Sequence, residues 1–223
     1  MSGDVDWEEH AEREERRYAE GLERDADDPD TRQRQLVRVA AAATGAGLAR
    51  LMQGRRAEAV GWFTRSAERF RESFEHAPPG SWGRPIGALK ARLLAGDRAG
   101  AEADASWALE QAPAKAESPI GRYAAALAHL AVGEDGEAAG LAGELQAAAE
   151  DAFPRPVADA LAALAAGDGA AYADAVARVL RSFEERDTYL EDIPVADTVI
   201  VLETLAEQRG LAARPSSGLL PGG

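Results

Sequence analysis

Cysteine is absent from the 223-residue chain and lysine is almost absent, since only Lys90 and Lys115 stand among the 25 basic residues. Without cysteine the chain has no disulfide, no thiolate metal ligand and no cysteine nucleophile, and nothing assigns it to an oxidising compartment. Apolar runs of about eighteen residues are also missing, so we expect no membrane span. The first thirty residues are charged where a signal peptide would be apolar. These absences predict a soluble, cytoplasmic protein.

Acidic residues outnumber basic ones, and the net charge is −14. The charge is uneven: residues 1–30 hold 13 acids and 4 bases, residues 31–98 hold 5 acids and 13 bases, and residues 99–223 hold 21 acids and 8 bases. Scarce lysine, abundant carboxylates and many alanines resemble the proteome of a salt-loving archaeon, where net charge keeps proteins soluble. A GC-rich genome would explain the arginine and alanine content but not the acidity.

Strand-like alternation is missing, and alanine, leucine, glutamate, arginine and glutamine dominate almost every segment. We therefore predict an all-α fold of about ten helices in one domain over residues 1–210. The acidic N-terminal helix, within 1–28, is expected to pack on that domain or cap it, and residues 211–223 form an extended or disordered tail. The predicted helices cover 4–24, 29–52, 55–76, a segment with Pro85 in its first turns that ends at Leu94, 97–112, 119–132, 135–150, 155–166, 169–186 and 194–209.

One segment carries two competing signals. Thr198-Val199-Ile200-Val201 is β-branched and suits a strand. Val199, Leu202 and Leu205 nevertheless keep the spacing of a helical face, and a buried helix tolerates β-branched residues at small cost. We predict a helix there.

Four short stretches share one pattern, in which a leucine precedes a glycine by three positions and a new helix follows. The glycines stand at intervals of 42, 37 and 34 residues, a period typical of paired-helix repeats. Each glycine is expected to take the left-handed conformation that ends one helix, so that the next helix folds back antiparallel. The four glycines are Gly54, Gly96, Gly133 and Gly167.

The first of these stretches, Gly54 to Ala59 followed by Phe63 and Ser66, resembles the middle of a tetratricopeptide repeat. The later copies keep little beyond the glycine and alanines, and the family's Trp-Leu-Gly-Tyr opening is absent. The resemblance covers roughly residues 36–186. It implies an antiparallel helix-pair array, or a compact α-α superhelix, whose groove holds a peptide or protein partner and performs no chemistry.

The end of the chain carries a second resemblance. A leucine-rich helix, Arg209-Gly210 and a short segment that closes on Leu219-Leu220-Pro221 look similar to the close of an all-α immunity-protein family associated with polymorphic toxins. This resemblance implies a toxin-neutralising role, which would be a special form of protein binding.

The basic middle of the chain supplies the candidate partner-binding residues, because arginine and tryptophan contribute much of the energy of protein interfaces. Three interpretations stay open: an external partner, salt bridges along one solvated helix with the aromatics in the core, or neutralisation of the basic helices by the acidic first helix. Nucleic acid is not expected, since a net charge of −14 repels phosphate. The candidates are Trp62, Arg65, Arg69, Trp82 and Arg84.

Catalytic, cofactor and metal sites are not predicted. Gly167-Asp168-Gly169 lacks the rest of a phosphate-binding pattern, so Asp168 is interpreted as the cap of the next helix. His10, His76 and His129 are never paired at helical spacing. We therefore expect a non-enzymatic protein-interaction module whose partner is a protein or peptide. An enzyme or small-ligand protein with a pocket between helices, using His129, is the alternative.

Overall fold

The computed structural model describes residues 5–24, 28–115, 117–148 and 152–222, and within them it has ten α-helices and no strand. The predicted all-α fold with about ten helices is confirmed, and so is the helix at Val199. Position 4 and positions 149–150 of the predicted helices lie outside the described residues. The helices are α1 (Trp7–Glu23), α2 (Pro29–Met52), α3 (Arg56–Phe74), α4 (Gly83–Ala95), α5 (Arg98–Glu110), α6 (Pro119–Val132), α7 (Asp135–Ala147), α8 (Arg155–Ala166), α9 (Gly169–Glu184) and α10 (Asp197–Glu207).

Proline marks the start of α2, α6 and α8, and a glycine follows the end of each of these helices and of α4. Pro29, Pro119 and Pro156 stand in the first turns of α2, α6 and α8, where the missing N–H is no loss. The four repeat glycines all have φ between 69° and 81°, a region that residues with a Cβ rarely adopt. Asp168 accepts hydrogen bonds from the N–H groups of Ala170 and Ala171 at 3.1 and 3.0 Å. Its sequence interpretation as a helix cap is confirmed.

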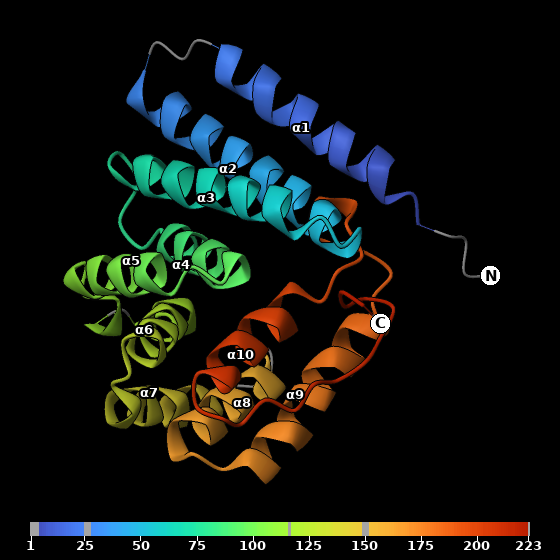
Figure 1. The fold of residues 1–223 in the computed structure, drawn as a ribbon. Coiled ribbons are helices and arrows are strands. Elements are labelled where there is room, and N and C mark those ends of the chain that lie inside the picture. Colours follow the sequence, from blue (N-terminus) through green and yellow to red (C-terminus); the bar gives the residue numbers. More distant parts are fainter. Residues whose placement is uncertain (1–4, 25–27, 116, 149–151, 223) are drawn as a thin grey trace.

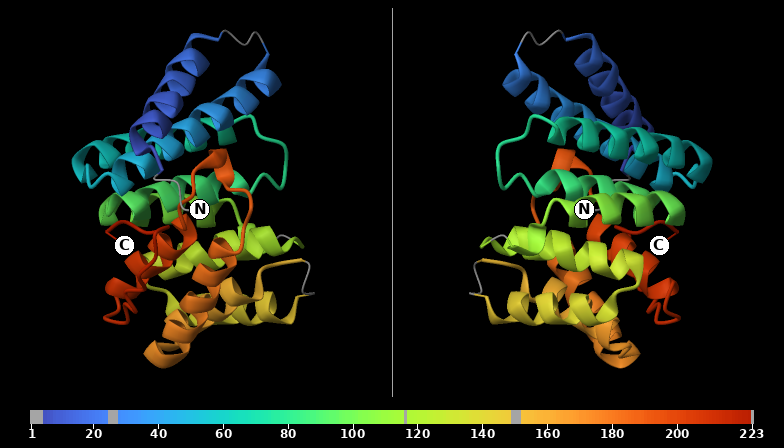
Figure 2. Two further views of the ribbon diagram at one scale, coloured as in Figure 1. Left: turned by 90° about the vertical axis from the view of Figure 1, so that its right-hand side faces the viewer. Right: turned by 90° about the vertical axis from the view of Figure 1, so that its left-hand side faces the viewer.

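Successive helices pack against one another to form a curved stack (Figures 1 and 2). The buried side chains are mostly alanine and leucine, which let neighbouring helices approach closely. At Gly47 of α2, an added Cβ would lie 2.6 Å from Cε1 of the fully buried Phe63 on α3. Close helix packing therefore explains this glycine.

The inner side of the curve is occupied by α10, which returns along the stack and contacts α4, α8 and α9 (Figure 1). Val199, Leu202 and Leu205 are buried there with at most 1% exposure. Two side-chain pairs hold α10 to α4 and α9, namely Lys90–Asp197 at 2.5 Å and Tyr172–Glu203 at 2.7 Å. Just beyond the end of α10, Arg209 pairs with Asp135 of α7 at 2.5 Å. The chain thus fills the inner face of its own helix stack.

Residues 211–222 follow an extended course beside α10. The Glu203 carboxylate accepts hydrogen bonds from the backbone N–H groups of Ala213 and Arg214 at 3.2 and 2.7 Å. The Ala196 N–H donates to the Leu219 carbonyl at 3.0 Å, and Leu220 is buried. The tail is therefore fixed to the start and to the middle of α10.

The acidic helix α1 is tied to the rest of the chain by charge. Arg50 of α2 is buried, and its guanidinium pairs with Glu8 and Glu15 of α1, each at 2.8 Å. Glu14, which is fully buried, pairs with Arg13 and Arg17 on its own helix. Both arginines also reach Glu191 in the segment between α9 and α10. Part of the opposite charge of residues 1–30 and 31–98 is thus neutralised inside the molecule.

Replacing three exposed glycines of α7 by alanine should stabilise the protein. An added Cβ at Gly136, Gly140 or Gly143 meets no atom within 4 Å, so each substitution should gain about 0.5–1 kcal/mol of helix propensity. Gly47→Ala is the matched control, because its Cβ would collide with Phe63 and should cost at least about 1 kcal/mol. Urea unfolding measures both effects, and the same sign for both would contradict this packing.

The free energy of unfolding should be highest over a middle range of pH and should fall at both acid and alkaline pH. Ion pairing and hydrogen bonding hold the pKa values of Glu8 and Asp159 below their ordinary range, so their contribution is present above about pH 4 and is lost as the pH falls. Burial raises the pKa values of Tyr123 and Tyr172, and Asp197 raises that of Lys90 against the opposing effect of burial. The contribution of these three groups is present below about pH 10 and is lost at higher pH.

Thermal unfolding followed by circular dichroism from pH 3 to pH 11 measures this profile. Tyr172→Phe should flatten part of the alkaline limb, because it removes one of the titrating groups. A melting temperature that rises above pH 10 would contradict the assignment of these groups.

Candidate functional site

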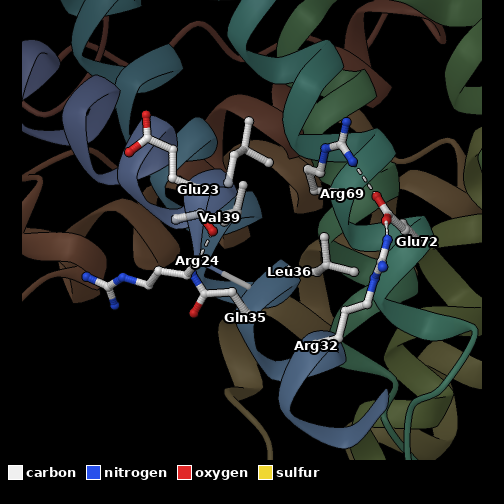
Figure 3. Close-up of a pocket in the computed structure, with 10 residues that line it drawn as sticks. Glu23, Arg24, Arg32, Gln35, Leu36, Val39, Arg69 and Glu72 are labelled. Atoms are coloured by element: carbon white, nitrogen blue, oxygen red, sulfur yellow. Dashed lines mark hydrogen bonds and ion pairs between the residues drawn. The ribbon is translucent and has the colours of Figure 1, made fainter. Parts of the chain in front are cut away.

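Two adjoining hollows lie where α1, α2 and α3 meet, with volumes of about 380 and 310 Å³. They share Arg32, Leu36 and Glu72, and we call them together the edge groove. The first hollow is bounded by the end of α1, and the second by the start of α2 and the end of α3. Figure 3 shows the first hollow, with side chains from all three helices around it.

The residues that line the edge groove are mostly polar. Leucine and valine supply three apolar side chains among them: Leu36 and Val39 of α2, which are buried, and Leu22 of α1. Leu22 is 49% exposed, and among the described residues only Ile120, at 45%, is another large exposed hydrophobic side chain. A single exposed apolar side chain is ordinary on a protein surface. The candidate therefore rests on the position of Leu22 beside hollows of about 380 and 310 Å³, which lie in the size range of binding pockets.

The walls of the edge groove carry paired charges. Arg32 of α2 contacts the Glu72 carboxylate at 3.0 Å, and Arg69 of α3 pairs with the same carboxylate (Figure 3). Partial burial opposes the charge of Arg69, but hydrogen bonding to Tyr18 and the charge of Glu72 outweigh it and raise the pKa of this guanidinium. Glu72 therefore forms ion pairs with both arginines at the boundary between the two hollows.

Three of the predicted residues form a row on α3 beside α1. Trp62 is half-buried and meets Tyr18 of α1 edge-on, with ring centroids 5.3 Å apart and an interplanar angle of 82°. Arg65 is exposed, and its guanidinium lies 4.6 Å from the Trp62 ring centroid. Of the three, only Arg69 lines the edge groove.

The other two predicted residues stand at the start of α4. Trp82 is half-buried and precedes the helix without a side-chain cap. Arg84 is half-buried, and its guanidinium donates to the side-chain oxygen of Gln33, which lines the second hollow. Burial without a compensating charge lowers the pKa of Arg84. Of the five predicted residues, only Arg69 lines the edge groove, and Arg84 contacts one of its lining residues, Gln33.

A third hollow, of about 660 Å³, lies between α3 and α5. Its wall stacks Phe74 edge-on against Trp107, with centroids 5.4 Å apart, and Arg71 lies over the Trp107 ring. The buried carboxylate of Asp104 pairs with Arg71 at 2.7 Å and with Arg92 at 3.1 Å. Both cations of this hollow are therefore neutralised, as Arg32 and Arg69 are in the edge groove. The exposed Leu22 is the feature that favours the edge groove.

The described residues offer little else that carries chemistry. The Nδ1 atom of His129 lies 2.7 Å from the Glu134 carboxylate, beyond the end of α6. No group of three or more His, Cys, Asp or Glu side chains in the described ranges could hold a metal ion. No α-helix in these ranges combines the length and the apolar character needed to cross a membrane. Comparisons of the chain with family models, with curated proteins and with solved structures give no match.

Proposed function

We propose that this protein is a non-enzymatic protein-interaction module that binds its partner, a protein or peptide, in the edge groove. The observation that carries this proposal is an open groove between three helices, with the solvent-exposed Leu22 at its side and Arg32 and Arg69 on its walls. The inner face of the stack is filled by α10. We therefore place the partner in the edge groove and not on the inner face.

We further propose that the helix pairs are degenerate tetratricopeptide-type repeats. The supporting contacts lie in the first pair, where Ala59, Phe63 and Ser66 are fully buried at positions that the family's pattern gives to small and aromatic residues. The Ser66 hydroxyl donates to the Ala40 carbonyl of α2 at 3.0 Å, which joins the two helices. On this proposal, the tetratricopeptide resemblance applies to the packing of the helix pairs. The partner binds at the edge of the stack and not on its inner face.

A pull-down from high-salt native lysate tests the function with two matched variants. Leu22→Asp places a charge in the edge groove, and Ile120→Asp places the same charge on an equally exposed position of α6. The wild type and Ile120→Asp should capture the same stoichiometric protein, and Leu22→Asp should lose it. Equal capture by all three, or no capture by the wild type in several salts, would overturn the proposal. A captured toxin would identify the toxin-neutralising form of this function.

We also propose that the net charge of −14 reflects an intracellular medium of high salt. Salt shortens the range of charge repulsion, from a Debye length of about 10 Å at 0.1 M to about 3 Å at 1 M. Raising KCl from 0.1 to 2 M should therefore raise the melting temperature, by roughly 4–8 °C if the gain is about 2 kcal/mol. A melting temperature that falls with KCl would show that the ion pairs outweigh the net repulsion.

A further inference from the structure

The C-terminal tail, residues 211–222, lies on the molecule as a bound peptide lies on its receptor. It contains neither helix nor strand and runs across α9 and α10 (Figure 1). Leu220 is buried in the core, and Leu211 and Leu219 pack against that core. Most of the residues between these leucines are exposed. The tail is therefore anchored by apolar side chains near its two ends.

The middle of the tail is held by one carboxylate of α10. The two oxygens of Glu203 accept hydrogen bonds from the successive backbone N–H groups of Ala213 and Arg214, at 3.2 and 2.7 Å. The hydroxyl of the fully buried Tyr172 donates to Glu203 at 2.7 Å and so orients the carboxylate. Successive N–H groups commonly bind an anion in this way. The contact recognises the main chain, so it does not depend on the side chains at positions 213 and 214.

The bound tail carries conformational strain at Arg214. The φ angle of this residue is 52°, in the left-handed region that residues with a Cβ rarely adopt. Its side chain is exposed, whereas its N–H donates to Glu203. The strain therefore accompanies the main-chain contact, and it opposes binding of the tail.

The attachment of α10 to the stack does not involve the tail. Val199, Leu202 and Leu205 are at most 1% exposed, and α10 contacts α4, α8 and α9. The ion pair between Lys90 and Asp197, at 2.5 Å, also joins the start of α10 to α4. The tail can therefore open while α10 stays in place.

We propose that residues 211–222 are a releasable strap over a peptide-binding face of α9 and α10, and that this face binds an extended segment of a partner protein. The segment has the features of the tail itself: two successive free N–H groups for Glu203 and a leucine pair beyond them, as Leu219 and Leu220 follow Arg214. None of the face residues bonded to the tail lines the edge groove, so this inference does not rest on the proposed function. They are Glu184, Ala196, Glu203 and Ala206.

The test uses a fluorescein-labelled peptide of residues 211–223, titrated with full-length protein and followed by fluorescence anisotropy in 0.5 M KCl. Leu220→Asp puts a charge at the buried anchor and should release the protein's own tail, so that the face binds the peptide. The wild type should bind it at least tenfold more weakly, because its tethered tail competes at a millimolar effective concentration.

Gly218→Asp is the matched control for the added charge. Gly218 is an exposed residue of the tail, and an added Cβ there meets no atom within 4 Å. This variant should keep its tail bound and should bind the peptide as weakly as the wild type. Glu203→Gln, added to Leu220→Asp, should weaken peptide binding about tenfold, because it turns an amide NH₂ toward one of the two N–H groups.

A second releasing variant protects the test against a fold defect at position 220. Ala213→Pro removes one of the two N–H donors at an exposed position and leaves the buried leucine intact. It should also bind the peptide, with the helical circular dichroism of the wild type. A peptide that carries Arg214→Gly should bind about threefold more tightly, because glycine adopts a positive φ without strain.

Three outcomes would overturn the inference. Absence of peptide binding by the folded Leu220→Asp and Ala213→Pro variants would show that the tail is a permanent part of the fold. Equal binding by the wild type and Leu220→Asp would place the peptide on another surface. A wild-type dimer that Leu220→Asp abolishes would assign the face to the tail of a second copy of this chain and not to a partner protein.

Discussion

Leu205→Ala should lower the free energy of unfolding by about 2–5 kcal/mol, the range for removing a fully buried leucine side chain. Leu205 is 0% exposed and lies on α10 against the inner side of the stack. The free energy of unfolding falls by this much only if α10 is a permanent part of the core. If α10 were loosely attached, shortening one of its apolar side chains would change the free energy of unfolding little.

Urea unfolding of this variant should be compared with that of Ile120→Ala, which removes a side chain that is 45% exposed on α6. The control should change the free energy of unfolding by no more than about 0.5 kcal/mol. A similarly small effect for Leu205→Ala would mean that α10 is only weakly held on the inner face.

Glu14→Ala should lower the free energy of unfolding by about 2–4 kcal/mol, because it removes a fully buried carboxylate from two arginines. Arg13 and Arg17 are 37% and 43% exposed, so water recovers part of the lost interaction and the cost stays below that of a wholly buried pair. The same arginines reach Glu191, so the substitution also loosens the segment that leads into α10.

Glu12→Ala is the matched control on the same helix, since its pair with Arg16 is exposed at both ends. Exposed pairs contribute about 0–1 kcal/mol, and the control should lie in that range. Equal effects for the two substitutions would show that Glu14 does not link α1 to the rest of the chain.

The helices and their ends could be predicted from the sequence because their signals are local. Pro29 and Pro119 mark starts, and Gly96 and Gly133 mark ends, through backbone preferences that do not depend on tertiary contacts. The helix at Val199 was also predictable, since helical spacing of apolar residues outweighs the strand preference of β-branched side chains in a buried helix.

The place of α10 could not be predicted, because its partners are distant in the sequence. Lys90 meets Asp197 across 107 positions, and no local pattern encodes that contact. The edge groove was missed for a similar reason: Leu22 stands on the apolar side of α1, but it lies where that helix ends and is left open. Composition did point to Arg69 and Arg84 as candidates, but only the fold shows that Arg84 alone lacks a carboxylate among the described arginines that are not exposed.

Amide hydrogen exchange of the full chain, alone and saturated with the protein that the pull-down captures, tests most directly whether a partner binds at the edge of the stack. We expect added protection in residues 21–24, 29–39 and 69–76, with α10 equally and strongly protected in both states. Loss of protection in α10 on binding would contradict the account, because it would show that the ligand displaces α10 and enters the inner face.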